Sequence, residues 1–184
     1  MELETDKRGR ERQFASLITL LQPDRDAWDL WLNAMASGDY RFGFGLLRSA
    51  DDEYDPWGVL VMLNGGQWVW DEAEEAWAFR KSAVALEPID MVRWLGCQRA
   101  NATPLETFQR AQQGLTTLVS ALADTVSDFG SVVSVLRAAH ATSMGDRERL
   151  IHAIKASTSF GASGPDAVDR SVDIFSRSPF YGRR

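Results

Sequence analysis

The stretch from Tyr40 to Leu63 constrains the fold of this chain more than any other. Its first part alternates aromatic residues with glycines, which is the two-residue period of a strand. An acidic turn follows at residues 51–53. Asp55 then precedes Pro56 and a continuous apolar run, and an aspartate cap before a proline predicts the start of a helix. We therefore expect a strand, a tight acidic turn and a short buried helix.

A second pair of strands is predicted on either side of an acidic loop. Residues 67–70 and 76–79 are rich in tryptophan, valine and phenylalanine, and the turn signal Asn64-Gly65-Gly66 precedes them. Residues 71–75 lack the spacing and the glycine of a calcium loop, so we interpret them as a solvated hairpin connection. Because glutamate and alanine favour helices, residues 71–81 could form a helix instead. The sequence leaves these two alternatives open.

Apolar residues at helical spacing predict helices in the rest of the chain. The first ends before Pro23, and the second, capped by Asp24, carries four large apolar residues on one face. The expected helices cover residues 14–21, 24–36, 88–95, 104–122, 129–136 and 146–155. Together the elements indicate an α+β fold, with helices packed on a small, mostly antiparallel sheet.

The distribution of residue types indicates one domain. A chain of 184 residues is long enough for one sizeable core, and all seven tryptophans lie between Trp28 and Trp94. Beyond Ala156 the chain turns to serine, glycine, aspartate and arginine. We expect a disordered segment at residues 1–9, a folded domain at 10–155 and a flexible tail at 156–184.

Charge and hydropathy exclude several classes of protein. A net charge of -6 argues against a general nucleic-acid coat, because neutralising phosphates needs concentrated lysine and arginine. No apolar run approaches the roughly 20 residues that span a bilayer, so we expect no membrane association. The charged N-terminus is not a secretory signal. The single cysteine, Cys97, excludes an internal disulfide and fits a reducing cytoplasm.

The stretch from Ser37 to Leu63 resembles a group of small proteins of unknown function from tailed bacteriophages and prophages. The shared pattern is Ser-Gly-x-Tyr, Gly-x-Gly-x-Leu and Tyr-x-x-x-Gly-Val-Leu, which begin here at Ser37, Gly43 and Tyr54. The similarity extends more weakly over residues 28–137. Cysteines of the pattern are replaced here by Asp55, Pro56 and Val61, so no thiol role transfers. The resemblance implies a phage origin and a shared fold, and it implies no activity.

No set of reacting groups can be assembled from the sequence. Only His140 and His152 are present, and no Gly-x-Ser-x-Gly elbow accompanies them. The Gly43-x-Gly45 pair opens no helix, as a phosphate-binding loop would. Cys97 follows a helix end and is expected to be a small buried side chain. We therefore expect a protein that is not an enzyme and needs neither cofactor nor metal.

The helices between Leu115 and Leu136 leave a DNA-binding alternative open. Joined near residues 125–127, they resemble the front of a helix-turn-helix, and a third helix could bring basic residues to phosphates. These residues are Arg137, His140, Arg147, Arg149, His152 and Lys155. Acidic residues interrupt the region at Asp124, Asp128 and Asp146, and simple helix packing explains the same pattern. We do not expect nucleic acid as the partner.

Aromatic residues point to protein binding instead. Seven tryptophans are more than a small sheet easily hides, and Trp68 and Trp70 share one face of a strand. The tail offers further aromatic and arginine anchors that could order against a partner. The expected partner-binding residues are Phe42, Phe44, Arg48, Trp68, Trp70, Trp77, Phe180, Tyr181 and Arg183.

The function expected from the sequence is that of a phage accessory protein. It would bind a host or phage protein in the host cytoplasm and take over or regulate it, without catalysis. A virion-associated minor structural protein and a helix-turn-helix regulator are the alternatives, and self-association stays open.

Overall fold

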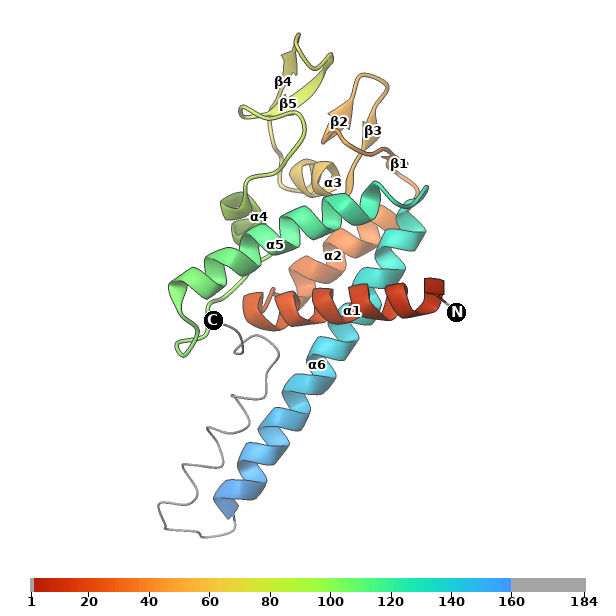
Figure 1. Ribbon diagram of the computed structural model, residues 1–184. Coiled ribbons are helices and arrows are strands. Elements are labelled where there is room, and N and C mark those ends of the chain that lie inside the picture. The colour runs from red at the N-terminus through yellow and green to blue at the C-terminus, as the bar shows by residue number, and fades with distance from the viewer. Residues whose placement is uncertain (1, 160–184) are drawn as a thin grey trace. The chain divides into compact units, whose positions relative to one another are not determined.

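The structure, a computed structural model, describes residues 2–159 and confirms the α+β class. Within these residues it has six helices and a five-stranded mixed sheet (Figure 1). The helices are α1 Glu2–Leu21, α2 Arg25–Ala36, α3 Pro56–Leu63, α4 Pro88–Trp94, α5 Leu105–Ala123 and α6 Phe129–Ser159. The strands are β1 Arg41–Phe42, β2 Arg48–Ser49, β3 Glu53–Tyr54, β4 Trp68–Asp71 and β5 Ala76–Phe79. Phe180, Tyr181 and Arg183 lie outside the described residues.

The chain divides into two compact units, residues 1–144 and 145–184, and the second is described up to Ser159. Helix α6 runs through the boundary without a break, so the separate helix predicted at residues 146–155 is wrong. Good helix formers such as Arg147, Glu148 and Leu150 follow Gly145, and an existing helix propagates through them at little cost. Residues 156–159, expected in the tail, are the last helical residues of α6.

The N-terminal helix is longer than the apolar pattern predicted. Residues 2–9, expected to be disordered, form the first turns of α1. Adding a residue to an existing helix costs little, and glutamate, lysine and arginine propagate helices well. The apolar face of α1 packs along α5, where Gly114 lies against Leu17. Phe14 and Ile18 on this face are fully or almost fully buried.

The sheet is mostly antiparallel, as predicted, in the order β1-β3-β2-β5-β4. Only β1 and β3 run parallel. The continuous strand predicted from Tyr40 to Arg48 is wrong, because β1 ends at Phe42 and β2 begins at Arg48. Gly45, with φ +76°, turns the chain between the two strands.

The hairpin predicted at residues 67–79 is confirmed as β4 and β5. Its connection is a loop and not the alternative helix over residues 71–81. The Asp71 carboxylate accepts the backbone N–H groups of Ala73 at 2.9 Å and Glu74 at 3.3 Å. An aspartate that caps a turn in this way offers the backbone an alternative to helical bonding.

Helix α3 lies between the sheet and helices α2 and α5 (Figure 1). It begins as predicted, with the Asp55 carboxylate accepting the Gly58 N–H at 2.6 Å and Pro56 in its first turn. Trp57 stacks on Trp31 of α2, with ring centroids 4.9 Å apart, and donates to the Thr116 carbonyl of α5. These contacts make α3 the central element of the core.

Candidate functional site

One face of the sheet carries a row of large side chains. Directly opposite residues in neighbouring strands point to the same face. The register pairs Phe42 with Tyr54, Tyr54 with Arg48, Arg48 with Trp77, and Trp77 with Trp70. The row therefore crosses all five strands and ends on the edge strand β4.

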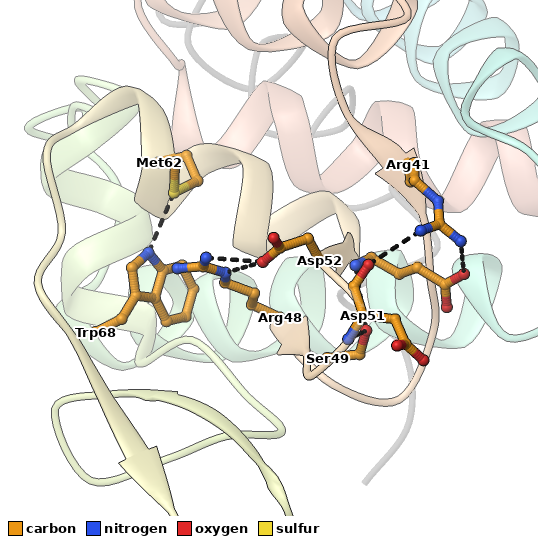
Figure 2. Close-up of polar contacts among 8 residues, drawn as sticks. Arg41, Arg48, Ser49, Asp51, Asp52, Met62 and Trp68 are labelled. Atoms are coloured by element: carbon orange, nitrogen blue, oxygen red, sulfur yellow. Dashed lines mark hydrogen bonds and ion pairs between the residues drawn. The ribbon is translucent and has the colours of Figure 1, made fainter.

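Arg48 occupies the middle of this row, between aromatic rings and a carboxylate. Its guanidinium carbon lies 4.9 Å from the Trp77 ring centroid and 5.7 Å from both the Trp68 and Tyr54 centroids. Its Nη2 lies 2.7 Å from Asp52 Oδ1, and its Nε donates to the same oxygen at 2.8 Å. Figure 2 shows the guanidinium between the Trp68 ring and Asp52.

Arg48 therefore has a structural role in this surface, because it contacts side chains from several neighbouring strands. Only 20% of its side chain is exposed, and its charge is balanced by Asp52. Cation–π contacts of this kind are worth about 0.5–2 kcal/mol, with the larger values where water is excluded. The arginine joins β2 and β3 to the hairpin through these contacts.

The base of the hairpin is anchored on two helices. The Trp68 indole N–H donates to the Met62 sulfur of α3 at 3.1 Å (Figure 2). Phe79, opposite Trp68 in the register, lies with its ring centroid 5.3 Å from that of Trp94 in α4. These contacts fix how β4 and β5 leave the core.

The far end of the hairpin stands clear of the helices. Trp70 and Trp77 meet edge to face with centroids 5.4 Å apart, a favourable aromatic geometry. Trp70 is 38% exposed, and Val69, on the opposite face of β4, is 60% exposed. We call residues 69–77 the hairpin tip. It presents apolar side chains to solvent on a scaffold that is already ordered.

The acidic turn between β2 and β3 is closed by local hydrogen bonds. The Ser49 hydroxyl accepts the N–H groups of Asp51 and Glu53, and Arg41 bonds the Asp51 carbonyl and the Glu53 carboxylate. Figure 2 shows Arg41 reaching across to this turn. The turn places Asp52 beside Arg48.

Several ionisable groups lie outside this surface, among them the buried Asp90, which pairs with Arg80 at 2.9 Å. Among the described residues, no three of His, Cys, Asp and Glu gather where they could hold a metal ion. Burial raises the pKa of the Cys97 thiol to about 12, so the thiol stays protonated. Burial also lowers the pKa of His140, whose ring lies beside Trp28. The charge of Asp29 opposes the shift at His140 but does not outweigh burial.

An open groove of 370 Å³ lies between α1 and α5. Its lining is mixed, from Gln13 on α1 to Arg110 and Leu118 on α5. Arg110 pairs with Glu106 one turn earlier, which neutralises the charge at this end. The groove therefore offers no convergent set of binding groups.

The structure brings together four of the expected binding residues and separates two. Arg48, Trp68, Trp70 and Trp77 form one surface, as described above. Phe42 is partly buried and packs edge to face on Phe129 of α6, so it lies against the core and apart from that surface.

Phe44 is 67% exposed on the connection from β1 to β2 and makes no ring contact with another described residue. Val69 and Asp52 also belong to the candidate site, although neither was among the expected binding residues. Strand alternation alone could have placed Val69 on the face opposite Trp68 and Trp70.

Comparisons with protein-family models, curated proteins and solved structures found no match to this chain. Among residues 2–159, no helix combines the length and the apolar character that crossing a membrane requires.

Proposed function

We propose that this chain is a phage-encoded accessory protein that binds another protein through the hairpin tip inside the infected cell. The observation that carries the proposal is the exposure of Trp70 and Val69 on an ordered edge strand. The phage origin is supported by the resemblance of residues 37–63 to phage proteins.

The chemistry of the tip suits a protein partner. Tryptophan is enriched among the residues that dominate binding energy, because it buries a large area with few rotatable bonds. Here Trp70 packs against Trp77, and Arg48 contacts the Trp77 ring, so Trp70 is held before any partner arrives. Binding therefore costs little side-chain entropy, which favours affinity.

The experiment that tests this function is capture of a partner from infected cells with the full chain as bait. Trp70→Ala is the test variant. Leu30→Ala is the matched control, because Leu30 is 59% exposed and lies on α2. Loss of an interface tryptophan costs at least about 2 kcal/mol, so we expect roughly 30-fold weaker binding with Trp70→Ala.

The control variant should bind the partner as the natural chain does. Equal capture by natural chain and Trp70→Ala would contradict the proposal. Recovery of the chain in purified phage particles, identified by mass spectrometry, would favour a structural role in the virion instead.

A further inference from the structure

The two edges of the sheet differ in how they are protected. Edge strands are commonly blunted by short length or by charged residues, because exposed backbone groups can pair with another chain. At one edge, β1 has two residues and begins with the exposed Arg41. At the other edge, β4 has four residues and contains no proline and no basic residue.

The register shows which backbone groups of β4 face outward. Phe79 exchanges both of its backbone hydrogen bonds with Ser82, on the side of β5 away from β4. In an antiparallel ladder these directions alternate from one residue to the next. The pairs of Val69 with Ala78 and of Asp71 with Ala76 are then the hydrogen-bonded ones.

It follows that the N–H and C=O groups of Trp68 and Trp70 point away from the sheet. Two residues along a strand are separated by about 6.8 Å, which is the spacing at which a neighbouring strand forms its bonds. The outer edge of β4 therefore offers the N–H and C=O groups of two residues at the spacing that an antiparallel strand needs for pairing.

The loop at the end of β4 is acidic and has no counter-charge. Glu72, Glu74 and Glu75 are exposed, and none of them forms an ion pair with another described residue. Only Asp71 uses its carboxylate locally, on the backbone of the loop. A segment that pairs with β4 would thus run beside concentrated negative charge.

This charge argues against a second copy as the occupant. Two chains of net charge -6 repel each other, and pairing of two β4 strands would bring no basic residue to the loops. A segment rich in lysine and arginine gains attraction at the same place.

We propose that β4 binds an extended, basic segment of the partner protein, which adds to the sheet as a sixth strand. This inference rests on the proposed function and names the form of the partner. The backbone of this segment forms hydrogen bonds with the backbone of Trp68 and Trp70. Its side chains alternate between the face of β4 that carries the two tryptophans and the opposite face, which carries Val69. Its lysines or arginines lie beside the glutamates of the loop. This is the strand-addition mode of peptide recognition.

The test uses the full chain and the peptide acetyl-Arg-Val-Lys-Val-Arg-Val-Lys-amide. Hydrogen exchange is followed by NMR at individual amides. We expect saturating peptide to slow exchange of the Trp68 and Trp70 amides by about tenfold or more, because these N–H groups gain acceptors. The Val69 and Asp71 amides, which already face β5, serve as internal controls and should change little.

Two changes separate backbone pairing from charge. A peptide N-methylated at two adjacent central residues cannot pair through either edge and should bind at least about tenfold more weakly. The variant Glu72→Lys/Glu74→Lys should lose a similar factor. The control Asp39→Lys/Glu87→Lys makes the same change in net charge at exposed sites outside the hairpin and should keep its affinity within about twofold.

Three results would overturn the inference. One is equal binding of the N-methylated peptide, and another is binding without protection of the Trp68 and Trp70 amides. The third is their protection without peptide, together with a dimer in sedimentation, which would assign the edge to a second copy. If Trp70→Ala still lost the captured partner, the proposed function would stand without strand addition. If Trp70→Ala kept that partner, the proposed function itself would fail.

Discussion

Asp55 caps the start of α3 although its carboxyl group is buried. Its side chain is 2% exposed, and it accepts the Gly58 N–H at the start of α3. Burial raises the pKa of Asp55 to about 7, and the N–H groups of Gly58 and Trp57 oppose the shift. The cap is therefore a protonated carboxyl over much of the acidic range.

This shift predicts that Asp55 lowers stability as pH rises. In the unfolded chain its pKa is about 3.9, so between about pH 4 and pH 7 the unfolded state releases a proton that the folded state keeps. From pH 5 to pH 8 the contribution to the free energy of unfolding should decrease by about 3 kcal/mol. Denaturant unfolding at both pH values measures it.

The matched variant is Asp55→Asn, which keeps the side-chain oxygen that caps α3 but cannot titrate. Its stability relative to the natural chain should improve from pH 5 to pH 8. His140, with its lowered pKa, acts in the opposite direction and is present in both chains, so it cancels in the difference. A difference independent of pH would contradict the expected burial effect.

The close packing at Gly58 predicts that an added side chain there lowers stability. A Cβ added there would lie 1.7 Å from the Leu47 carbonyl oxygen, closer than any real contact. Gly58→Ala must therefore displace α3 or the chain before β2, and we expect a loss of about 3 kcal/mol or more. Thermal or denaturant unfolding measures the change.

The control for that substitution is Gly9→Ala in α1, where nothing lies within 4 Å of the added carbon. Alanine is the better helix former, so this variant should gain about 0.5–1 kcal/mol. Destabilisation by both variants alike would mean that the close approach at Leu47 is not what matters.

At the scale of the elements, the hairpin is held by contacts from outside itself. An isolated two-stranded hairpin is marginally stable in water. Here β5 pairs with β2 on its inner side, and Arg48 of β2 contacts a ring of each hairpin strand. The order of the hairpin tip is therefore set by β2 and not by the hairpin sequence alone.

The variant Arg48→Met tests this dependence. It keeps an apolar stem but removes the cation–π contacts and the ion pair with Asp52, so we expect a loss of about 1–3 kcal/mol. The near-ultraviolet circular dichroism of the tryptophans should weaken as the rings gain freedom. Arg41→Met removes an exposed ion pair with Glu53 and should change stability by less than about 1 kcal/mol. Equal losses from the two variants would contradict a special role for Arg48.

For the molecule as a whole, one large core connects the helices of residues 1–144. This cluster of buried apolar residues extends from Phe14 in α1 to Ala139 in α6 and includes Trp31 and Trp57, and a smaller cluster holds Ala76, Ala78 and Ala83. Small domains built on one core usually unfold in one cooperative step. The helices and the tryptophan-rich core should therefore be lost together.

Phe14→Ala tests this cooperativity. Phe14 is fully buried, and truncation of a buried phenylalanine costs about 3–5 kcal/mol. Although the change lies in α1, tryptophan fluorescence and far-ultraviolet circular dichroism should report the same shifted midpoint. Separate midpoints for the two signals would show that α1 unfolds independently of the tryptophan core.

Local signals in the sequence predicted most of the elements. Asp24 and Asp55 cap α2 and α3 as expected, and the stripe from Trp28 to Met35 is buried. The hairpin pattern of residues 67–79 is also confirmed. Each of these depends on residues a few positions apart, where side-chain type and period decide the conformation.

Features that depend on distant residues could not be predicted in this way. Phe42 packs edge to face on Phe129, which lies far along the chain in α6. The close approach at Gly58 involves Leu47, and the continuity of α6 overrode the helix start predicted at Asp146. Nothing near these residues in sequence indicates which segments will lie beside them.

Some features of the candidate site likewise depend on nearby residues, and others depend on distant ones. Because a strand alternates its side chains, the residues alone place Trp68 and Trp70 on one face, with an acidic loop after them. The edge position of β4, the exposure of Trp70 but not of Trp31 or Trp57, and the contacts of Arg48 with aromatic rings come from the folded arrangement. Burial and strand order depend on which distant segments pack together, and no local pattern of residue types specifies that.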